Sequence, residues 1–527
     1  MQTNKKILYG DEARAELKKG IDIVANAVKI TLGPVGRNVA IGHPYGSPII
    51  TNDGVSIAQS IKVKDPFQQM GVKIAQEVAS KTDSVAGDGT TTTLILFQAI
   101  IEEGLNEINN KTNVMDIKRG IEEGVKVYVE ELRKQAKPVT TFEEIKNVAY
   151  ISVEDEEVAN TIAKILYKIG VQGLVTVEES DKAGVNVEET GGMKINKGYA
   201  SEYVINNFER MVGDYDDVPV LITSKKVLIS KDLIPLLEKL ASSGQKKLLL
   251  IADDIDGEAL ASFTMNKARN LFDIIPVRFP VFGEGKYDEL EDIAIRCGTF
   301  VVGDRSEKQI KDVKVEDLGH VDKCQVKRDT TLLINGKGNV HGRVGDLSNL
   351  KDTLDIKESK DIISTRISNL LSKVAIIKVG ATTDTERRYL KLKIDDAVNA
   401  TKGAMEEGVV AGGGWALVDI FYLKYKDGGD VKKGIDIIKK ATEYPFIQLL
   451  KNCGVSGKTF FGYNTNMSQG YNAKTGRYTT DLVKEGVVDP VKVTINALQN
   501  AASAAALFLT TEVIIADEEE IKQTNET

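Results

Sequence analysis

The hydrophobic pattern of the chain changes character twice, and this change most constrains the fold. In the first and last thirds, long segments such as residues 13–31 place apolar side chains three or four positions apart, as amphipathic helices do. In the middle third, short apolar runs alternate with helical ones: a strand over 247–252, a helix over 257–270 and a strand over 274–277. Such alternation is typical of a parallel α/β layer. The order predicts an α/β module inserted into a helical domain, whose two flanks pack together to bury their apolar faces.

The same patterns give the bounds of the other expected elements. Helices are predicted over 66–83, 90–109, 116–136, 287–297, 356–373 and 384–408, and strands over 38–41, 47–51, 174–178, 186–189 and 299–302. The longest apolar run, 501–516, contains Ser503 and Glu512. It is too short and too polar to span a bilayer, so we interpret it as a buried core helix.

Composition excludes several classes of function. A chain of 527 residues is long enough for about three domains. Acidic residues outnumber basic ones by 77 to 69, which argues against a nucleic-acid partner, because nonspecific binding needs a basic face. The three cysteines and three histidines lie far apart, so neither a disulfide framework nor a zinc site is expected. The N-terminus lacks the apolar segment of a secretory signal, and we expect a cytoplasmic protein with no membrane partner.

The motif Gly87-Asp88-Gly89, followed by four threonines at 90–93, is the sharpest local feature. Glycines allow a tight turn, and the N-terminus of the helix that follows offers unpaired N–H groups to a phosphate. Asp88 is then a candidate ligand for the magnesium ion that accompanies a nucleotide. The motif is not a Walker A loop, because no Gly-Lys-Ser/Thr follows. An ordinary capped helix after a tight turn explains the same residues, and both interpretations stay open at this point.

Other candidate residues carry weaker local signals. Glycine turns occur at 31–34 and 411–414, and such turns are mostly structural. Asp53, Asp396 and Asp489 are by default solvated surface residues. Neither composition nor periodicity brings these positions together.

Five motifs in one order resemble the equatorial domain of group I chaperonins, the GroEL type. They are TLGPVGRNVAIG at 31–42, TNDGVSIA at 51–58, VAGDGTTTT at 85–93, EEGVVAGGG at 406–414 and VVDPVKVTINALQNAAS at 487–503. The segments GYASEYVIN at 198–206 and GEALA at 257–261 resemble the apical region more loosely. The resemblance extends from about residue 13 to residue 517.

The resemblance implies a multidomain fold that combines α and α/β parts. A helical equatorial ATP-binding domain is expected over 1–134 and 407–527. A small intermediate hinge domain is expected over 135–190 and 375–406, and an inserted α/β apical domain over 191–374. This agrees with the inserted order that the hydrophobic pattern predicts.

The resemblance also implies an ATPase with ATP and Mg²⁺ as cofactors. Asp88 matches the magnesium ligand, Asp53 the aspartate near the γ-phosphate and the attacking water, and Asp396 the intermediate-domain aspartate that activates this water, with Asp395 as its adjacent competitor. Asn52 stands where the family usually has lysine, on the side of the phosphates or of a potassium ion (K⁺). The implied nucleotide contacts are Thr31, Leu32, Gly33, Pro34, Asn52, Gly89, Thr90, Thr91, Thr92, Ile151, Ser152, Gly413, Asn472, Ala473, Val487 and Asp489.

For capture of non-native polypeptides the family uses an apolar apical rim, which a GroES-type co-chaperonin lid also contacts. The matching positions are Tyr199, Tyr203, Val204, Ile234, Leu237, Leu260, Thr264 and Met265. An exposed apolar band marks a partner site, whereas the same residues in a core would be ordinary packing.

The function that the resemblance implies is a chaperonin that assembles as a seven-membered ring or a double ring, encapsulates non-native proteins and uses ATP hydrolysis to time their release. A divergent ring-forming holdase or scaffold with little ATP turnover is the alternative, which Asn52 and Ser372-Lys373 at a hinge position keep open. A small-molecule phosphotransferase would explain the phosphate motif but not the apical rim, and it ranks last.

Overall fold

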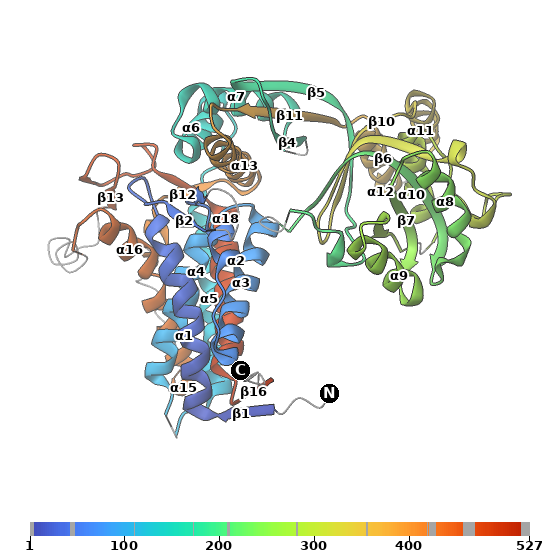
Figure 1. The fold of residues 1–527 in the computed structure, drawn as a ribbon. Coiled ribbons are helices and arrows are strands. Elements are labelled where there is room, and N and C mark those ends of the chain that lie inside the picture. The colour runs from blue at the N-terminus through green and yellow to red at the C-terminus, as the bar shows by residue number, and fades with distance from the viewer. Residues whose placement is uncertain are drawn as a thin grey trace. The chain divides into compact units, whose positions relative to one another are not determined.

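A computed structural model describes residues 5–42, 48–109, 111–171, 173–207, 211–280, 283–354, 357–418, 420, 428–456 and 470–517. The chain divides into two compact units (Figure 1). The first unit comprises Met1–Val171, Glu179–Val185 and Val379–Thr527, and the second comprises Gln172–Glu178 and Asn186–Lys378. The predicted division of the chain into equatorial, intermediate and apical domains stays a prediction.

The first unit is a helical bundle built from both ends of the chain (Figure 1). Fully buried side chains from both flanks, such as Phe97 and Leu498, share one core, which confirms the expected packing of the flanks. The helices are α1 (Gly10–Val28), α2 (Gly54–Ser60), α3 (Pro66–Ala86), α4 (Thr90–Glu107), α5 (Val114–Gln135), α6 (Phe142–Val153), α7 (Glu156–Ile169), α13 (Asp384–Glu407), α14 (Trp415–Val418), α15 (Gly429–Ala441), α16 (Tyr444–Asn452) and α18 (Val491–Leu509).

Two pairs of glycines let helices of this bundle approach closely. A Cβ built on Gly20 of α1 would lie 1.9 Å from a backbone oxygen of α3, and one built on Gly71 of α3 would lie 2.0 Å from a backbone oxygen of α1. Gly120 of α5 and Gly434 of α15 meet in the same way. Any side chain at these positions would push the helices apart, so the glycines fix the spacing of the bundle.

Among its described residues, the first unit also contains four antiparallel two-stranded sheets. They pair β1 (Lys5–Tyr9) with β16 (Val513–Asp517), β2 (Val39–Ile41) with β3 (Ile49–Thr51), β12 (Val409–Ala411) with β15 (Val488–Pro490), and β13 (Gly470–Asn472) with β14 (Arg477–Thr479). The expectation of one helix over 501–516 was therefore wrong in its second half. Helix α18 ends at Leu509, and residues from Val513 pair with the first strand.

The second unit contains most of an eight-stranded sheet of order β4-β11-β5-β10-β9-β6-β7-β8. Its strands are β4 (Leu174–Glu179), β5 (Gly184–Ile195), β6 (Gly213–Val227), β7 (Lys247–Ile255), β8 (Asp273–Arg278), β9 (Gly319–Val326), β10 (Thr331–Gly336) and β11 (Lys373–Gly380). The helices are α8 (Ile234–Ser242), α9 (Gly257–Ala268), α10 (Glu284–Cys297), α11 (His341–Thr353) and α12 (Lys357–Leu370).

This sheet corrects three expectations. Strand β7 pairs parallel with both β6 and β8, whereas β9 pairs antiparallel with β6 and β10 pairs antiparallel with both β9 and β5, so the layer is mixed. Residues 299–302 do not form a strand, because Val302 makes only an isolated bridge to Thr223. The helix expected to continue to residue 373 ends at Leu370, and β11 starts at Lys373.

In the described part of the chain, no helix is both long and apolar enough to cross a membrane.

A buried ion network holds helices α10, α11 and α12 together. Asp292 of α10 is only 1% exposed. Its carboxylate accepts hydrogen bonds from Arg366 Nε at 2.7 Å, Arg366 Nη2 at 3.0 Å and Arg343 Nε at 2.9 Å. Such bidentate guanidinium–carboxylate contacts are strong and directional. The network therefore fixes α12 against α10 by charge as well as by apolar packing.

Arg296, one turn further along α10, is the opposite case. It is 8% exposed, and its Nε has no hydrogen-bond partner. Its guanidinium lies against Gly191 of β5, where an added Cβ would lie 2.0 Å from Nη2. Burial lowers the pKa of this guanidinium, which is the sign of a poorly compensated charge. Burial of this guanidinium therefore carries a desolvation cost that its Nε does not offset with a hydrogen bond.

We expect Arg296→Met to raise the free energy of unfolding by about 1–3 kcal/mol, because it removes an unsatisfied buried group. The matched change Arg366→Met should lower the free energy of unfolding by about 3–5 kcal/mol, because it removes two of the three hydrogen bonds to the buried Asp292 carboxylate and leaves only Arg343 to compensate its charge. Urea unfolding of both variants measures the two effects. Destabilisation by both changes would show that Arg296 has a stabilising partner.

Candidate nucleotide site and apolar groove

The loop between α3 and α4 in the first unit is confined from two sides. Gly87 (φ 67°) ends α3 and Gly89 (φ 87°) precedes α4, both in the left-handed region that favours glycine. A Cβ on Gly87 would lie 2.4 Å from Asn399 Cβ of α13, and one on Gly89 would lie 2.5 Å from Val493 Cγ1 of α18. Gly89 has no side chain, so it cannot accept a hydrogen bond from the first N–H groups of α4. These N–H groups, in the turn that contains Thr90, Thr91 and the half-buried Thr92, can therefore bind an anion.

The structure brings two other predicted segments to this loop. Thr31 Oγ1 lies 3.2 Å from Thr91 Oγ1. Asp53 caps α2 by accepting the N–H groups of Val55 at 3.2 Å and Ser56 at 3.1 Å. A Cβ on the next residue, Gly54, would lie 3.1 Å from Thr91 Oγ1, so α2 begins directly beside the threonines. Asn52 is half-buried and Pro34 is exposed.

The carboxylates near the loop carry an excess of negative charge. Burial raises the pKa of Asp88 to about 6, with further contributions from the charges of Asp489, Asp83 and Asp53. Burial likewise raises the pKa of Asp489 to about 6, although the N–H groups of Gly414 and Gly413 oppose this shift. A divalent cation would relieve this repulsion. Mg²⁺ is usually held by one or two carboxylates and by phosphate oxygens, so the residues fit this ion.

An apolar cluster adjoins the other end of the site. Gly33 and Gly413 both face Leu449: an added Cβ would lie 2.2 Å and 2.8 Å, respectively, from its methyl groups. Pairing of β12 with β15 sets Val410 opposite Asp489, next to the glycine turn. A flat, mostly apolar base suits the half-buried side chains that pack on this cluster. The cluster contains Trp415, Val418, Phe446, Leu449, Leu450, Tyr471 and Leu482, with Leu32, Ala473 and Val487 packed against it.

Asn472 is engaged within its own hairpin. Its side-chain oxygen accepts the N–H groups of Lys474 at 3.1 Å and Thr475 at 3.2 Å, and its Nδ2 donates to Glu485 at 2.7 Å. The hydrogen bonds to Lys474 and Thr475 stabilise the turn that follows Asn472. Lys474 Nζ also donates to Tyr150 Oη at 3.0 Å, which ties the hairpin to α6, where Ile151 and Ser152 follow.

Helix α13 carries Asp396 to the same region. Asn399 packs on Gly87, and residues three apart share a helix face, so Asp396 lies one turn from this contact on the same side. Asp395 and Asp396 are both half-buried. Of the residues that shape the site, sequence reasoning missed Leu449 and Val493. No sequence motif marks either residue, because the role of each is to pack against a glycine that lies far away in the sequence.

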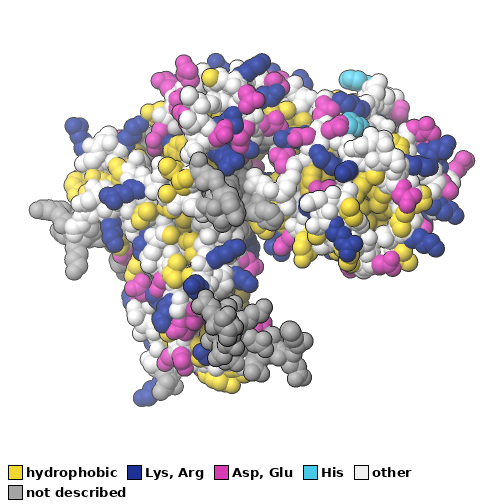
Figure 2. Space-filling view, in the orientation of Figure 1, with side chains coloured by type: hydrophobic (Ala, Val, Ile, Leu, Met, Phe, Trp, Pro, Cys, Tyr) yellow, Lys and Arg dark blue, Asp and Glu magenta, His cyan; other side chains and the backbone are white. Residues whose placement is uncertain are grey.

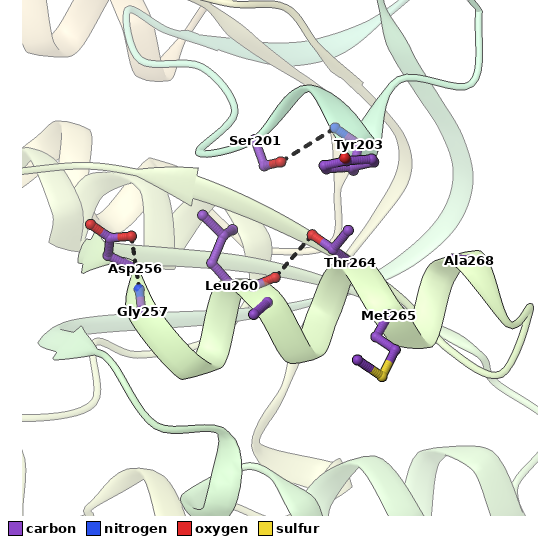
Figure 3. Close-up of a pocket in the computed structure, with 9 residues that line it drawn as sticks. Ser201, Tyr203, Asp256, Gly257, Leu260, Thr264, Met265 and Ala268 are labelled. Atoms are coloured by element: carbon purple, nitrogen blue, oxygen red, sulfur yellow. Dashed lines mark hydrogen bonds between the residues drawn. The ribbon is translucent and has the colours of Figure 1, made fainter. Parts of the chain in front are cut away.

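The second unit has an open groove of about 560 Å³ between α9 and the turn that contains the short helix η2 (Glu202–Val204) (Figure 3). Tyr203 is 67% exposed and Met265 is 54% exposed. Thr264 Oγ1 donates to Leu260 O at 3.0 Å, so its hydroxyl is satisfied within the helix. The lining residues are Ser201, Tyr203, Asp256, Gly257, Leu260, Ala261, Thr264, Met265 and Ala268.

The structure brings four of the eight expected rim residues, Tyr203, Leu260, Thr264 and Met265, into this groove. Ile234 (44% exposed) and the half-buried Leu237 lie on α8, outside its lining, and Tyr199 is half-buried beside Val277. The expectation for the Val204 side chain needs correction: it is 2% exposed and packs in the core under the sheet. Figure 2 shows apolar side chains on the visible face of the second unit. The exposed apolar residues of this unit include Leu228, Ile229 and Leu271.

Comparison with known families now decides the identity. The model of the TCP-1/cpn60 chaperonin family matches residues 24–519. The chain belongs to this chaperonin family. This confirms the resemblance that the five motifs indicate.

Solved structures agree with this assignment at the level of the fold. The chaperonin gp146 from bacteriophage EL 2 (Pseudomonas aeruginosa), in a crystal form grown in the presence of ATP-BeFx, is similar over 97% of this chain and 99% of that chain, with 22% identity and a TM-score of 0.67. A second crystal form gives the same identity and coverage with a TM-score of 0.61. The multidomain fold with helical and α/β parts is thus that of a chaperonin.

The raised pKa of Asp88 predicts a pH dependence of stability for the chaperonin without Mg²⁺ or nucleotide. The folded state keeps the proton up to about pH 6, whereas the unfolded chain loses it near 3.8, the ordinary pKa of an aspartate. Stability therefore falls as the pH rises through this interval. Asp88→Asn should remove this loss and stabilise the protein at pH 8 more than at pH 4. Urea unfolding at both pH values measures the difference, and equal effects would contradict a shifted carboxyl.

Proposed function

We propose that this chaperonin hydrolyses ATP and uses the hydrolysis to drive cycles of capture and release of non-native proteins. The observation that carries the proposal is the contact of Asn399 with Gly87, because it sets the helix of Asp396 against the phosphate-type loop. The presence of ATP-BeFx in the gp146 crystals supports a nucleotide as the ligand.

Each side of the site has a separate task in this proposal. Bound ATP supplies the phosphoanhydride bond, and bound Mg²⁺ offsets the charge of its phosphates. The first turn of α4 and the threonine hydroxyls would hold the phosphates, Asp88 would hold the metal, and the half-buried residues packed on the cluster around Leu449 would contact the base. Asp53 orients the attacking water, and Asp396 accepts a proton from it. The half-buried Asn52 sits beside the phosphates or a K⁺ ion.

Replacing Asp396 with Ala should leave ATP binding intact and lower the turnover rate by about 100-fold or more, because the water loses its general base. Titration with a fluorescent ATP analogue and release of inorganic phosphate measure the two quantities. Asp395→Ala is the matched control and should keep near-normal turnover. Near-normal turnover in Asp396→Ala with a large loss in Asp395→Ala would reverse the assignment.

Capture of clients is assigned to the apolar groove of the second unit. A groove with exposed aromatic and thioether side chains gains free energy by burying an apolar segment. We propose that non-native polypeptides bind there, and that a GroES-type lid contacts the same surface. A homo-oligomer in the form of a seven-membered ring or a double ring, located in the cytoplasm, completes the proposal.

Met265→Glu should weaken capture of an unfolded protein by at least about tenfold, because a charge in the groove must be desolvated when the client binds. Suppression of aggregation of a chemically denatured test protein measures capture. Ile362→Glu is the matched control: Ile362 is 62% exposed on α12, outside the groove. Equal loss in both variants would contradict a specific groove.

A holdase or scaffold with little ATP turnover is the second candidate. Asn52 favours it, because the family usually has a lysine there. The hinge position at Ser372-Lys373 favours it too, because its backbone is held by a neighbouring strand. The N–H of Gly192 in β5 donates to Ser372 O at 3.1 Å, and a Cβ on Gly192 would lie 2.1 Å from Val374. This candidate predicts that the unmodified chain hydrolyses ATP no faster than Asp396→Ala, which the release of inorganic phosphate from both proteins decides.

A further inference from the structure

We propose that Lys267, which lies outside the groove lining, is a positioning residue that sets the spacing between its two walls. One wall is α9, with Leu260 and Met265. The other is the turn that carries Ser201 and Tyr203 (Figure 3). This inference rests on the proposed client-binding role of the groove. It gives the ammonium of Lys267 the role of fixing the geometry of an apolar binding site.

Lys267 is in the last turn of α9, and its ammonium points to the second wall. Its Nζ donates to Tyr215 Oη at 2.6 Å and to Val204 O at 3.2 Å. Tyr215 Oη in turn donates to the same carbonyl of Val204. Because Val204 directly follows Tyr203, these bonds fix the backbone at the aromatic wall relative to α9.

The surroundings of the ammonium make this tie strong. The side chain of Lys267 is 22% exposed, Nζ lies 3.2 Å from Asp273 Oδ1 at the start of β8, and it lies 5.2 Å from the centre of the Tyr215 ring. Tyr215 itself is 3% exposed. Charge-assisted hydrogen bonds in such partly dry surroundings are stronger than neutral ones. A single cation thus joins α9, β6, β8 and the η2 turn.

The burial of Val204 explains why the tie acts on Tyr203 in particular. The Val204 side chain packs in the core while its carbonyl receives both hydrogen bonds, so this residue is fixed at two points. Tyr203, in contrast, is 67% exposed and lies across the groove from α9 (Figure 3). The position of its backbone therefore depends on its neighbour, and through it on Lys267.

Loss of the ammonium should loosen the aromatic wall without removing any lining side chain. Lys267→Met keeps the length of the side chain but leaves Val204 O with one donor and removes the ammonium that lies 3.2 Å from the Asp273 carboxylate. The client must then order the loosened wall when it binds, and the free energy that this ordering costs weakens binding.

The experiment measures fluorescence anisotropy of a short fluorescein-labelled peptide, rich in Leu and Phe, bound to the full-length assembled chaperonin. Lys267→Met should raise the Kd by about tenfold. Lys267→Arg should restore most of the affinity, because a guanidinium reaches the same acceptors. Lys311→Met, at an exposed lysine of the second unit, is the control for the loss of a charge and should leave the Kd unchanged.

A double-mutant cycle with Tyr203→Ala separates positioning from a general structural role. If Lys267 acts through Tyr203, then Lys267→Met should change the Kd by less than about twofold in the Tyr203→Ala background. Equal fold-changes in both backgrounds would overturn the proposal, as would an unchanged Kd for Lys267→Met. If Lys267→Met unfolds, Tyr215→Phe removes one link of the tie and should give a smaller rise in Kd with the same dependence on Tyr203.

Failure of the proposed function has a different outcome. If the unmodified chaperonin does not bind the peptide, or if Met265→Glu binds it as tightly, the groove is not the client site. If Met265→Glu weakens binding and Lys267→Met does not, the groove is the client site and only the positioning role of Lys267 is refuted.

Discussion

The confinement of one glycine loop by two distant helices is the constraint on which the first unit depends. The backbone at Gly87 and Gly89 touches Asn399 of α13 on one side and Val493 of α18 on the other, with no room for a Cβ. This contact joins three segments that lie far apart in the sequence. It places a free helix N-terminus, a group of repelling carboxylates and the helix of Asp396 at one point, and the chemistry proposed for the site follows from this arrangement.

The second unit depends on charges in a different way. We infer that polar contacts fix the spacing between the two walls of its apolar groove. Lys267 links the walls, and Asp292 with two arginines fixes the helices α10 to α12. An exposed apolar surface would otherwise tend to collapse, since burial of apolar area is favourable. Buried polar contacts with fixed directions oppose this collapse.

The parts of the fold that the sequence predicted are those with local causes. The helix predicted up to Thr31, the helix predicted over 90–109 and the strands predicted over 247–252 and 274–277 follow from periodicity and glycine boundaries. The structure has them nearly as expected, with the second helix ending at Glu107 and the last strand spanning Asp273–Arg278. The errors have non-local causes. Helix α18 gives way to a strand after residue 509 because the N-terminal strand pairs there, and residues 299–302 look like a strand although only Val302 finds a partner.

By itself, the sequence determined the order of helical and α/β segments, the glycine turns and the family, because each depends on residue types at short spacing. Only the tertiary structure decided which of the candidates meet. It brought Thr31, Asp53 and Thr91 together, held the Asn472 amide within its own hairpin and turned Val204 into the core. It also revealed that Lys267, with no motif of its own, joins both walls of the groove. Periodicity describes one element at a time, whereas these contacts depend on how separate elements pack.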